Sequence, residues 1–208
     1  MNVSRSAAVV AIGAVLTVQA LIANSSQTSG QPKAKPGPVE KQRAATAESH
    51  GTVVARAHAD LAGQGITGTA DFTQRKNGTV SFVEIRLTAK GLKPGLHGVH
   101  LHAVGKCEPD FTAAGGHFDP GPAGNMDPDA NHPFHMGDLP QLEVGANGEG
   151  TLDAVTTRVT LTDGPLSLFD ADGSAIIIHG NPDQGITGEP KSGVSGGPRV
   201  ACGVIQKK

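Results

Sequence analysis

The sequence predicts an all-β domain, a Greek-key antiparallel β-barrel or sandwich of immunoglobulin-like type that carries two long functional loops. The 29 Gly and 14 Pro among 208 residues are high for a helical protein and suit short strands joined by many turns. From residue 51 onward, β-like runs alternate with turn signals, and no run of ordinary helix length shows 3.6-residue periodicity. Aromatic residues make up only 3% of the chain, so the core must rely on aliphatic side chains and a few Phe.

The expected strands follow one another through residues 51–208. They cover residues 52–59, 65–73, 79–88, 96–104, 141–144, 150–162, 174–179 and 200–205. The pair Asn77-Gly78 marks the first tight turn, because these residues readily adopt the positive φ angles of a short hairpin. Two Gly- and Pro-rich stretches, 105–140 and 180–198, separate later strands. Loops of this length within a compact domain are usually functional or disordered.

The first fifty residues are predicted to direct export and to link the domain to its N-terminus. Arg5 precedes an apolar-to-neutral run from Ala7 to Ala23, and small residues follow, as in a secretory signal peptide. Residues 1–23 are therefore a predicted signal peptide, with an uncleaved membrane anchor as the alternative. Residues 24–50, rich in Ser, Gln, Lys, Pro and Ala, are a predicted flexible linker. Either interpretation places the domain, residues 51–208, outside the cytoplasm, in the periplasm, the cell envelope or the extracellular space.

Charge is distributed unevenly between the N-terminal segment and the domain. Residues 1–50 carry five Lys and Arg against two Glu, which leaves 12 basic and 17 acidic residues for the remainder. An acidic domain binds nucleic acid poorly, so we expect no such partner. An anionic substrate would need a local positive feature to steer it.

The two cysteines, Cys107 and Cys202, lie far apart within the domain. In an exported protein an even pair indicates one disulfide, and two unrelated buried thiols are the alternative. A bridge would close a loop of nearly the whole domain. The entropy of loop closure would then contribute roughly 4–5 kcal/mol, and real gains are often smaller.

Histidines carry the predicted chemistry, and six of the nine lie between His97 and His135. His100 and His102 are two residues apart in an expected strand, so both side chains project from one face and can converge on a metal ion. A pair of surface histidines on an edge strand is the alternative for this motif alone. His97 lies at an odd offset from both and suits a structural hydrogen bond.

Further candidates increase the weight of this histidine pair. The first long loop holds His117, His132, His135 and Asp138, and His179 ends an apolar strand. Sites rich in histidine with a single carboxylate suit copper and zinc better than magnesium or calcium.

Five blocks resemble, in order and with similar intervals, the signature blocks of exported, bacterial-type copper/zinc superoxide dismutases. They are GLHGVHLHAVGKCE (95–108), AGGHFDP (114–120), HMGDL (135–139), SAIIIH (174–179) and RVACGVI (199–205). The resemblance extends through residues 51–208. It implies an enzyme that converts superoxide to O₂ and H₂O₂ by copper redox cycling beside a zinc site.

The resemblance also implies which residues bind the metals. The positions that match the copper ligands are His100, His102, His117 and His179. His117 would bridge copper and zinc, and His135 and Asp138 match two zinc ligands. The family usually has another zinc histidine about eight residues after the bridging one, where this chain has Asn125. We expect His132 to replace it, and the alternative is a solvent-facing His132 with weak or absent zinc.

Other matching positions imply supporting roles. Asp183 matches a carboxylate that links the two metal sites, and Arg199 matches an arginine beside copper that attracts and orients the anion. The cysteine pair matches the family's disulfide. An exported module that binds or delivers copper is the alternative function, although such a module has no need of Arg199. The resemblance leaves open whether the protein is a monomer or a homodimer.

Overall fold

The structure, a computed structural model, describes residues 50–121 and 124–208. The predicted signal peptide and nearly all of the predicted linker lie outside the described residues. In the described part, no helix has the length and apolar character needed to cross a membrane. The elements there are β1 (Thr52–Gly63), β2 (Thr67–Asn77), β3 (Val80–Lys90), β4 (Gly95–His97), β5 (Val99–His102), the 3₁₀ helix η1 (Phe111–Ala114), β6 (Leu142–Val144), β7 (Glu149–Thr156), β8 (Ala175–His179), β9 (Arg199–Val204) and β10 (Gln206–Lys207).

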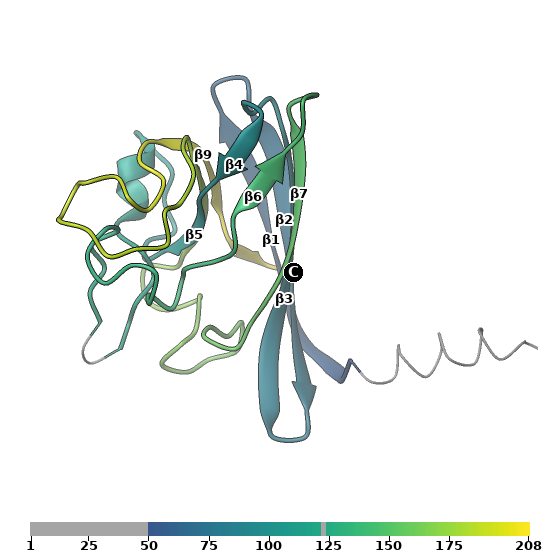
Figure 1. Ribbon diagram of the computed structural model, residues 1–208. Helices are drawn as coiled ribbons and strands as arrows, with labels where there is room; N and C mark the ends of the chain where they lie inside the picture. The colour runs from purple at the N-terminus through teal and green to yellow at the C-terminus, as the bar shows by residue number, and fades with distance from the viewer. Residues whose placement is uncertain (1–49, 122–123) are drawn as a thin grey trace, which may run out of the picture. The chain divides into compact units, whose positions relative to one another are not determined.

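The strands form one antiparallel sheet that curls into a nearly closed barrel, as predicted (Figure 1). The hydrogen-bonded order is β4-β6-β7-β3-β2-β1-β9-β8-β5, with β10 paired to β1. The strands at the two ends of this order, β4 and β5, are separated in the chain by Gly98 alone. The two edges of the sheet are therefore joined covalently, which brings them together. Pairing of β7 with β3 and of β9 with β1 gives the crossovers typical of Greek-key connections.

Several predicted strand boundaries differ from the observed ones, and two runs differ most in character. The run 96–104 is divided at Gly98, where a Cβ atom would lie 2.9 Å from the Ser195 carbonyl oxygen and 3.2 Å from the His100 ring. The run 150–162 stops being a strand at Thr156. Beyond that residue the amides of Leu161 and Thr162 donate to the side-chain Oε1 of Gln74 instead of to a neighbouring strand.

Burial differs between the two sides of the barrel. Strand β3 buries alternate side chains, as expected for a strand with one face against a core and one face in solvent. Strands β5 and β8 are buried at every position. Leu101 and Ile176 point into the main core, whereas Ile177 packs on the other face against Cys202. The face of β5 and β8 outside the barrel is therefore covered as well.

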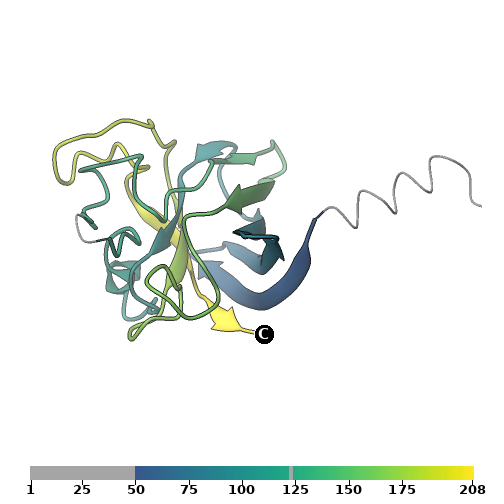
Figure 2. The same cartoon turned by 90° about the horizontal axis from the view of Figure 1, so that it is seen from below.

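The two long loops cover that outer face. In both views they lie on the same side of the barrel, the first loop in teal and the second in yellow (Figure 1, Figure 2). The predicted disulfide is confirmed, because Cys107 of the first loop is bonded to Cys202 of β9. The histidines on the outer face of β5 and β8 are thus enclosed between strands and loops.

Candidate metal centre

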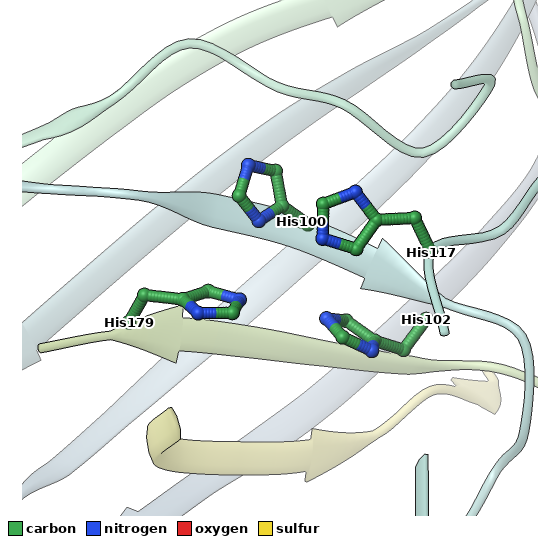
Figure 3. A group of neighbouring side chains, drawn as sticks. All are labelled: His100, His102, His117 and His179. Carbon is green, nitrogen blue, oxygen red and sulfur yellow. The ribbon is translucent and has the colours of Figure 1, made fainter. Parts of the chain in front are cut away.

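Four histidines predicted as copper ligands converge in one buried cluster (Figure 3). His100 and His102 come from β5, His179 from the end of β8, and His117 from the first loop. Each offers one ring nitrogen, and these four atoms all lie within 4.8 Å of one another. The sequence-derived expectation that His100 and His102 share a face therefore agrees with their positions.

Within the described part of the chain, each of these histidines has one ring nitrogen without a hydrogen-bond partner. The unpartnered atoms are Nδ1 of His100 and Nε2 of His102, His117 and His179. A buried polar atom left unpaired is costly, so such atoms need an explanation. Four of them converging on one point are explained by a metal ion that accepts their lone pairs.

The opposite nitrogens fix the tautomers of the strand histidines. Nδ1 of His102 donates to the Gly115 carbonyl at 3.0 Å, and Nδ1 of His179 donates to the Gly197 carbonyl at 2.9 Å. Nε2 of His100 donates to Asp183 Oδ2 at 3.0 Å. The nitrogens that face the centre therefore carry lone pairs, as metal ligation requires.

Burial also keeps these rings neutral. It lowers the pKa of His117 and of His179 to about 3 and places the pKa of His102 well below its usual value. Neutral imidazole is the form that binds metal.

The first loop reaches this centre by pairing with the free edge of β5. The amide of Phe118 donates to the Leu101 carbonyl at 2.8 Å, and the amide of Leu101 donates to the Gly137 carbonyl at 2.9 Å. Two single bridges, His102 with His117 and His100 with Asp138, belong to the same edge. Backbone pairing with β5 thus sets the positions of His117 and Asp138.

A second cluster adjoins the first: one ligand atom from each of His100, His117, His132 and Asp138 lies within 4.8 Å of the others, and His135 contacts Asp138 beside them. Asp138 lies at its middle, with Oδ1 2.7 Å from His117 Nδ1 and Oδ2 3.0 Å from His135 Nδ1. Nδ1 of His132 is 3.3 Å from the same Oδ2. Burial raises the pKa of Asp138, but the hydrogen bonds from the three histidines outweigh it and hold that pKa far below its usual value.

His132 is fully buried in this second cluster and does not face solvent. Its Nε2 donates to Asp183 Oδ1 at 2.7 Å, which leaves Nδ1 toward Asp138. Asn131 just before it has φ 67°, a left-handed conformation that Asn tolerates better than most residues. Asn125 makes a turn instead, because its Oδ1 accepts from the Asp127 amide.

Asp183 connects the two clusters through its two carboxylate oxygens, one accepting from His100 and the other from His132. Burial alone would raise the pKa of Asp183, but these hydrogen bonds outweigh burial and lower it. The amide of Asp183 donates to Gln141 Oε1 at 2.9 Å, so the carboxylate is itself fixed.

Arg199 lies at the start of β9, beside the first cluster. Its guanidinium donates to the carbonyls of Phe111 and Gly115, each at 2.6 Å. The Gly115 carbonyl also accepts from His102, so Arg199 and this candidate ligand share one acceptor. Arg199 lines a cleft of about 960 Å³ together with Asn181 and Gly197.

Sequence reasoning placed His97 outside the site and missed two polar residues that hold its loops. His97 contacts the carbonyls of His179 and Lys93 and belongs to neither cluster. Asp129 connects the two long loops, and Arg158 contacts the turn that carries His135 and Asp138. Neither lies in a recognisable motif, because their partners are distant in sequence.

The chain matches the sequence family described as copper/zinc superoxide dismutase (SODC) over residues 66–205. The chain belongs to the copper/zinc superoxide dismutase family. Its similarity to the Cu-Zn superoxide dismutase of Deinococcus radiodurans is 42% identity over 152 residues, 68% of this chain and 78% of that protein. The corresponding enzyme of Caulobacter vibrioides is 38% identical over 145 residues, 67% of this chain and 78% of that protein.

Solved structures of related proteins show the same fold. The clock protein EA4 superposes with a TM-score of 0.59 at 29% identity, over 74% of this chain and 96% of its own. A double mutant of a superoxide dismutase-like protein from Bacillus subtilis gives 0.54 at 32% identity, over 70% and 94%. Family membership makes the chain a superoxide dismutase with copper and zinc as cofactors, which confirms the predicted enzyme class and metals.

Proposed function

We propose that this superoxide dismutase is exported and works through copper held by His100, His102, His117 and His179, next to a zinc site that shares His117. The observation that carries the proposal is the set of four buried ring nitrogens that lack hydrogen-bond partners and lie within 4.8 Å of one another. Imidazole nitrogen suits copper in either oxidation state. When bound, copper would supply the one-electron chemistry that oxidises one superoxide to O₂ and reduces another to H₂O₂.

The second cluster suits zinc. The proposed zinc ligands are His117, His132 and Asp138 of this cluster, together with His135, which contacts Asp138. Zinc binds His nitrogen and Asp oxygen, and four ligands are typical of a closed structural zinc site. His132 is the proposed replacement for the missing histidine at position 125, since its Nδ1 lies 3.3 Å from Asp138 Oδ2 while its Nε2 is fixed by Asp183.

His117 is the proposed proton carrier. Its Nε2 faces the copper cluster without a protein partner, and its Nδ1 faces Asp138 and His135. Reduction of superoxide to H₂O₂ needs two protons. Nε2 of His117 can hold one of them and release it to the product, and solvent supplies the other.

Arg199 is the proposed anchor for the anionic substrate. A guanidinium stays charged at any working pH, and the carbonyls of Phe111 and Gly115 hold this one in place. The domain is otherwise acidic, so a fixed positive group beside the cluster is the local feature that superoxide needs.

Export rests on the N-terminal sequence and the disulfide. Residues 1–23 are the proposed signal peptide, residues 24–50 the linker, and residues 51–208 the enzyme domain. A disulfide between Cys107 and Cys202 suits the periplasm or the cell envelope, because disulfides persist mainly in oxidising compartments.

The test is superoxide dismutation by the purified full chain after loading with copper and zinc. We expect a second-order rate constant of about 10⁸–10⁹ M⁻¹ s⁻¹, near the diffusional ceiling, which a copper chelator abolishes. Tight copper binding with negligible turnover would instead favour the copper-delivery alternative and would leave Arg199 without a role.

A further inference from the structure

Arg158 makes contacts beside the second cluster that the proposed mechanism does not use. It lies two residues beyond the end of β7 and is half-buried. Its Nη1 donates to the His135 carbonyl at 2.9 Å, and its Nη2 donates to the Asp138 carbonyl. One guanidinium therefore holds both ends of the turn that runs from His135 to Asp138.

This turn carries two of the proposed zinc ligands and is held on its other side by the barrel. The Gly137 carbonyl accepts from the Leu101 amide at 2.9 Å, and the Gly137 amide donates to the Phe118 carbonyl at 2.8 Å. A Cβ atom at Gly137 would lie 2.4 Å from the Leu101 carbonyl oxygen, so the approach to β5 is very close. The turn is thus fixed between β5 on one side and Arg158 on the other.

The bonding of Arg158 differs from that of Arg75 and Arg86 and resembles that of Arg199, which also donates to two backbone carbonyls. Arg75 and Arg86 pair with the carboxylates of Glu84 and Asp153. Among the described residues Arg158 forms no such ion pair, and the two carbonyls of the turn are its side-chain hydrogen-bond partners. Its own amide donates to Thr156 Oγ1 at 3.1 Å, which ties it to the end of β7.

We infer that Arg158 is a positioning residue for zinc: its rigid fork fixes the His135–Asp138 turn and thereby the spacing of the two ligands. Nδ1 of His135 and Oδ2 of Asp138 are 3.0 Å apart in this turn. A guanidinium can bond two carbonyls at once in a fixed geometry, whereas a lysine cannot reproduce that fork. The inference rests on the proposed zinc site.

The experiment measures zinc affinity by competition with a chromophoric chelator, on the copper-loaded full chain. The variants are R158Q and R158K, and the matched control is R86Q, whose arginine forms an exposed ion pair on β3. We expect R158Q to bind zinc 10- to 100-fold more weakly, R158K to be intermediate, and R86Q to match the wild type. Cobalt placed in the zinc site should show altered visible absorption bands in R158Q, because the ligand geometry changes. Copper affinity and the melting temperature of the metal-free protein should stay near wild-type values.

Other outcomes would overturn the inference. Zinc affinity in R158Q within twofold of wild type would do so, and so would an equal loss of copper affinity and of metal-free stability, since that indicates a general structural role. If R158Q does not fold, a folded R158K with wild-type zinc affinity and cobalt bands would overturn it. A wild-type chain that binds no zinc would instead remove the proposed zinc site, and the inference with it.

Discussion

The copper and zinc sides of the centre are built in different ways. Three of the four copper-side histidines sit on strands of the barrel, in β5 and β8. All zinc-side residues belong to the first loop, whose position depends on β5, the second loop and Arg158. The copper side is therefore organised by the barrel itself, whereas the zinc side depends on contacts between loops.

Electrostatics separate the two sides further. On the copper side burial dominates and lowers the pKa of His117 and His179 to about 3. On the zinc side burial is outweighed by the carboxylates of Asp138 and Asp183, which raise the pKa of His132 to about 9. The copper side thus presents neutral rings with free lone pairs. The zinc side is held by histidine–carboxylate hydrogen bonds that zinc would have to replace.

The largest expected effect tests whether the copper side stands alone. In H102Q a ring of β5 is lost, and the main core on the other face of that strand is left intact. We expect dismutation to fall by more than about 100-fold, because the metal ion supplies the redox chemistry. Zinc affinity, measured by chelator competition, should stay within about threefold of wild type. Equal loss of both metals would show that the two sides are not built separately.

The converse variant is H132Q, which removes a proposed zinc ligand. We expect zinc affinity to fall by about 100-fold or more, because even the loss of a hydrogen bond that supports a metal ligand can lower metal affinity by about 100-fold. Copper binding and most of the activity should persist. His100 keeps its hydrogen bond to Asp183 in this variant, so the copper side retains its geometry. The measurement is metal content after dialysis. The control is H58Q, which replaces a histidine on the outside of β1. Unchanged zinc content would mean that His132 is not a ligand.

The same difference explains how much of the site could be predicted from sequence. Strand periodicity alone places His100 and His102 on one face, because side chains alternate along a strand. No local rule tells whether His132 turns inward, since that depends on Asn131 and on Asp183, which is distant in the chain. The division of the predicted strand 96–104 was also missed, because the close approach at Gly98 comes from the second loop.

The smallest expected effect concerns the contact between the two loops. The buried carboxylate of Asp129 accepts from the amides of Gly193 and Ser195, at 2.9 and 3.1 Å, and from the Ser195 hydroxyl at 2.9 Å. The loop that carries these partners leads directly into Arg199. In D129N an NH₂ group replaces one carboxylate oxygen. This group cannot accept from a backbone N–H, so a hydrogen bond worth about 1–3 kcal/mol is lost.

We expect D129N to lower activity several-fold, with Arg199 less firmly placed, and to speed hydrogen exchange at the Gly193 and Ser195 amides. Copper affinity should not change, because the copper-side histidines are held by strands and backbone carbonyls. Zinc affinity should fall only slightly, since Asp129 lies three residues before His132. D127N is the matched control, because the described residues that donate to the Asp127 side chain are the amides of Asp129 and Ala130 in its own loop. A large loss of copper in D129N would mean that the copper side also depends on contacts between the loops.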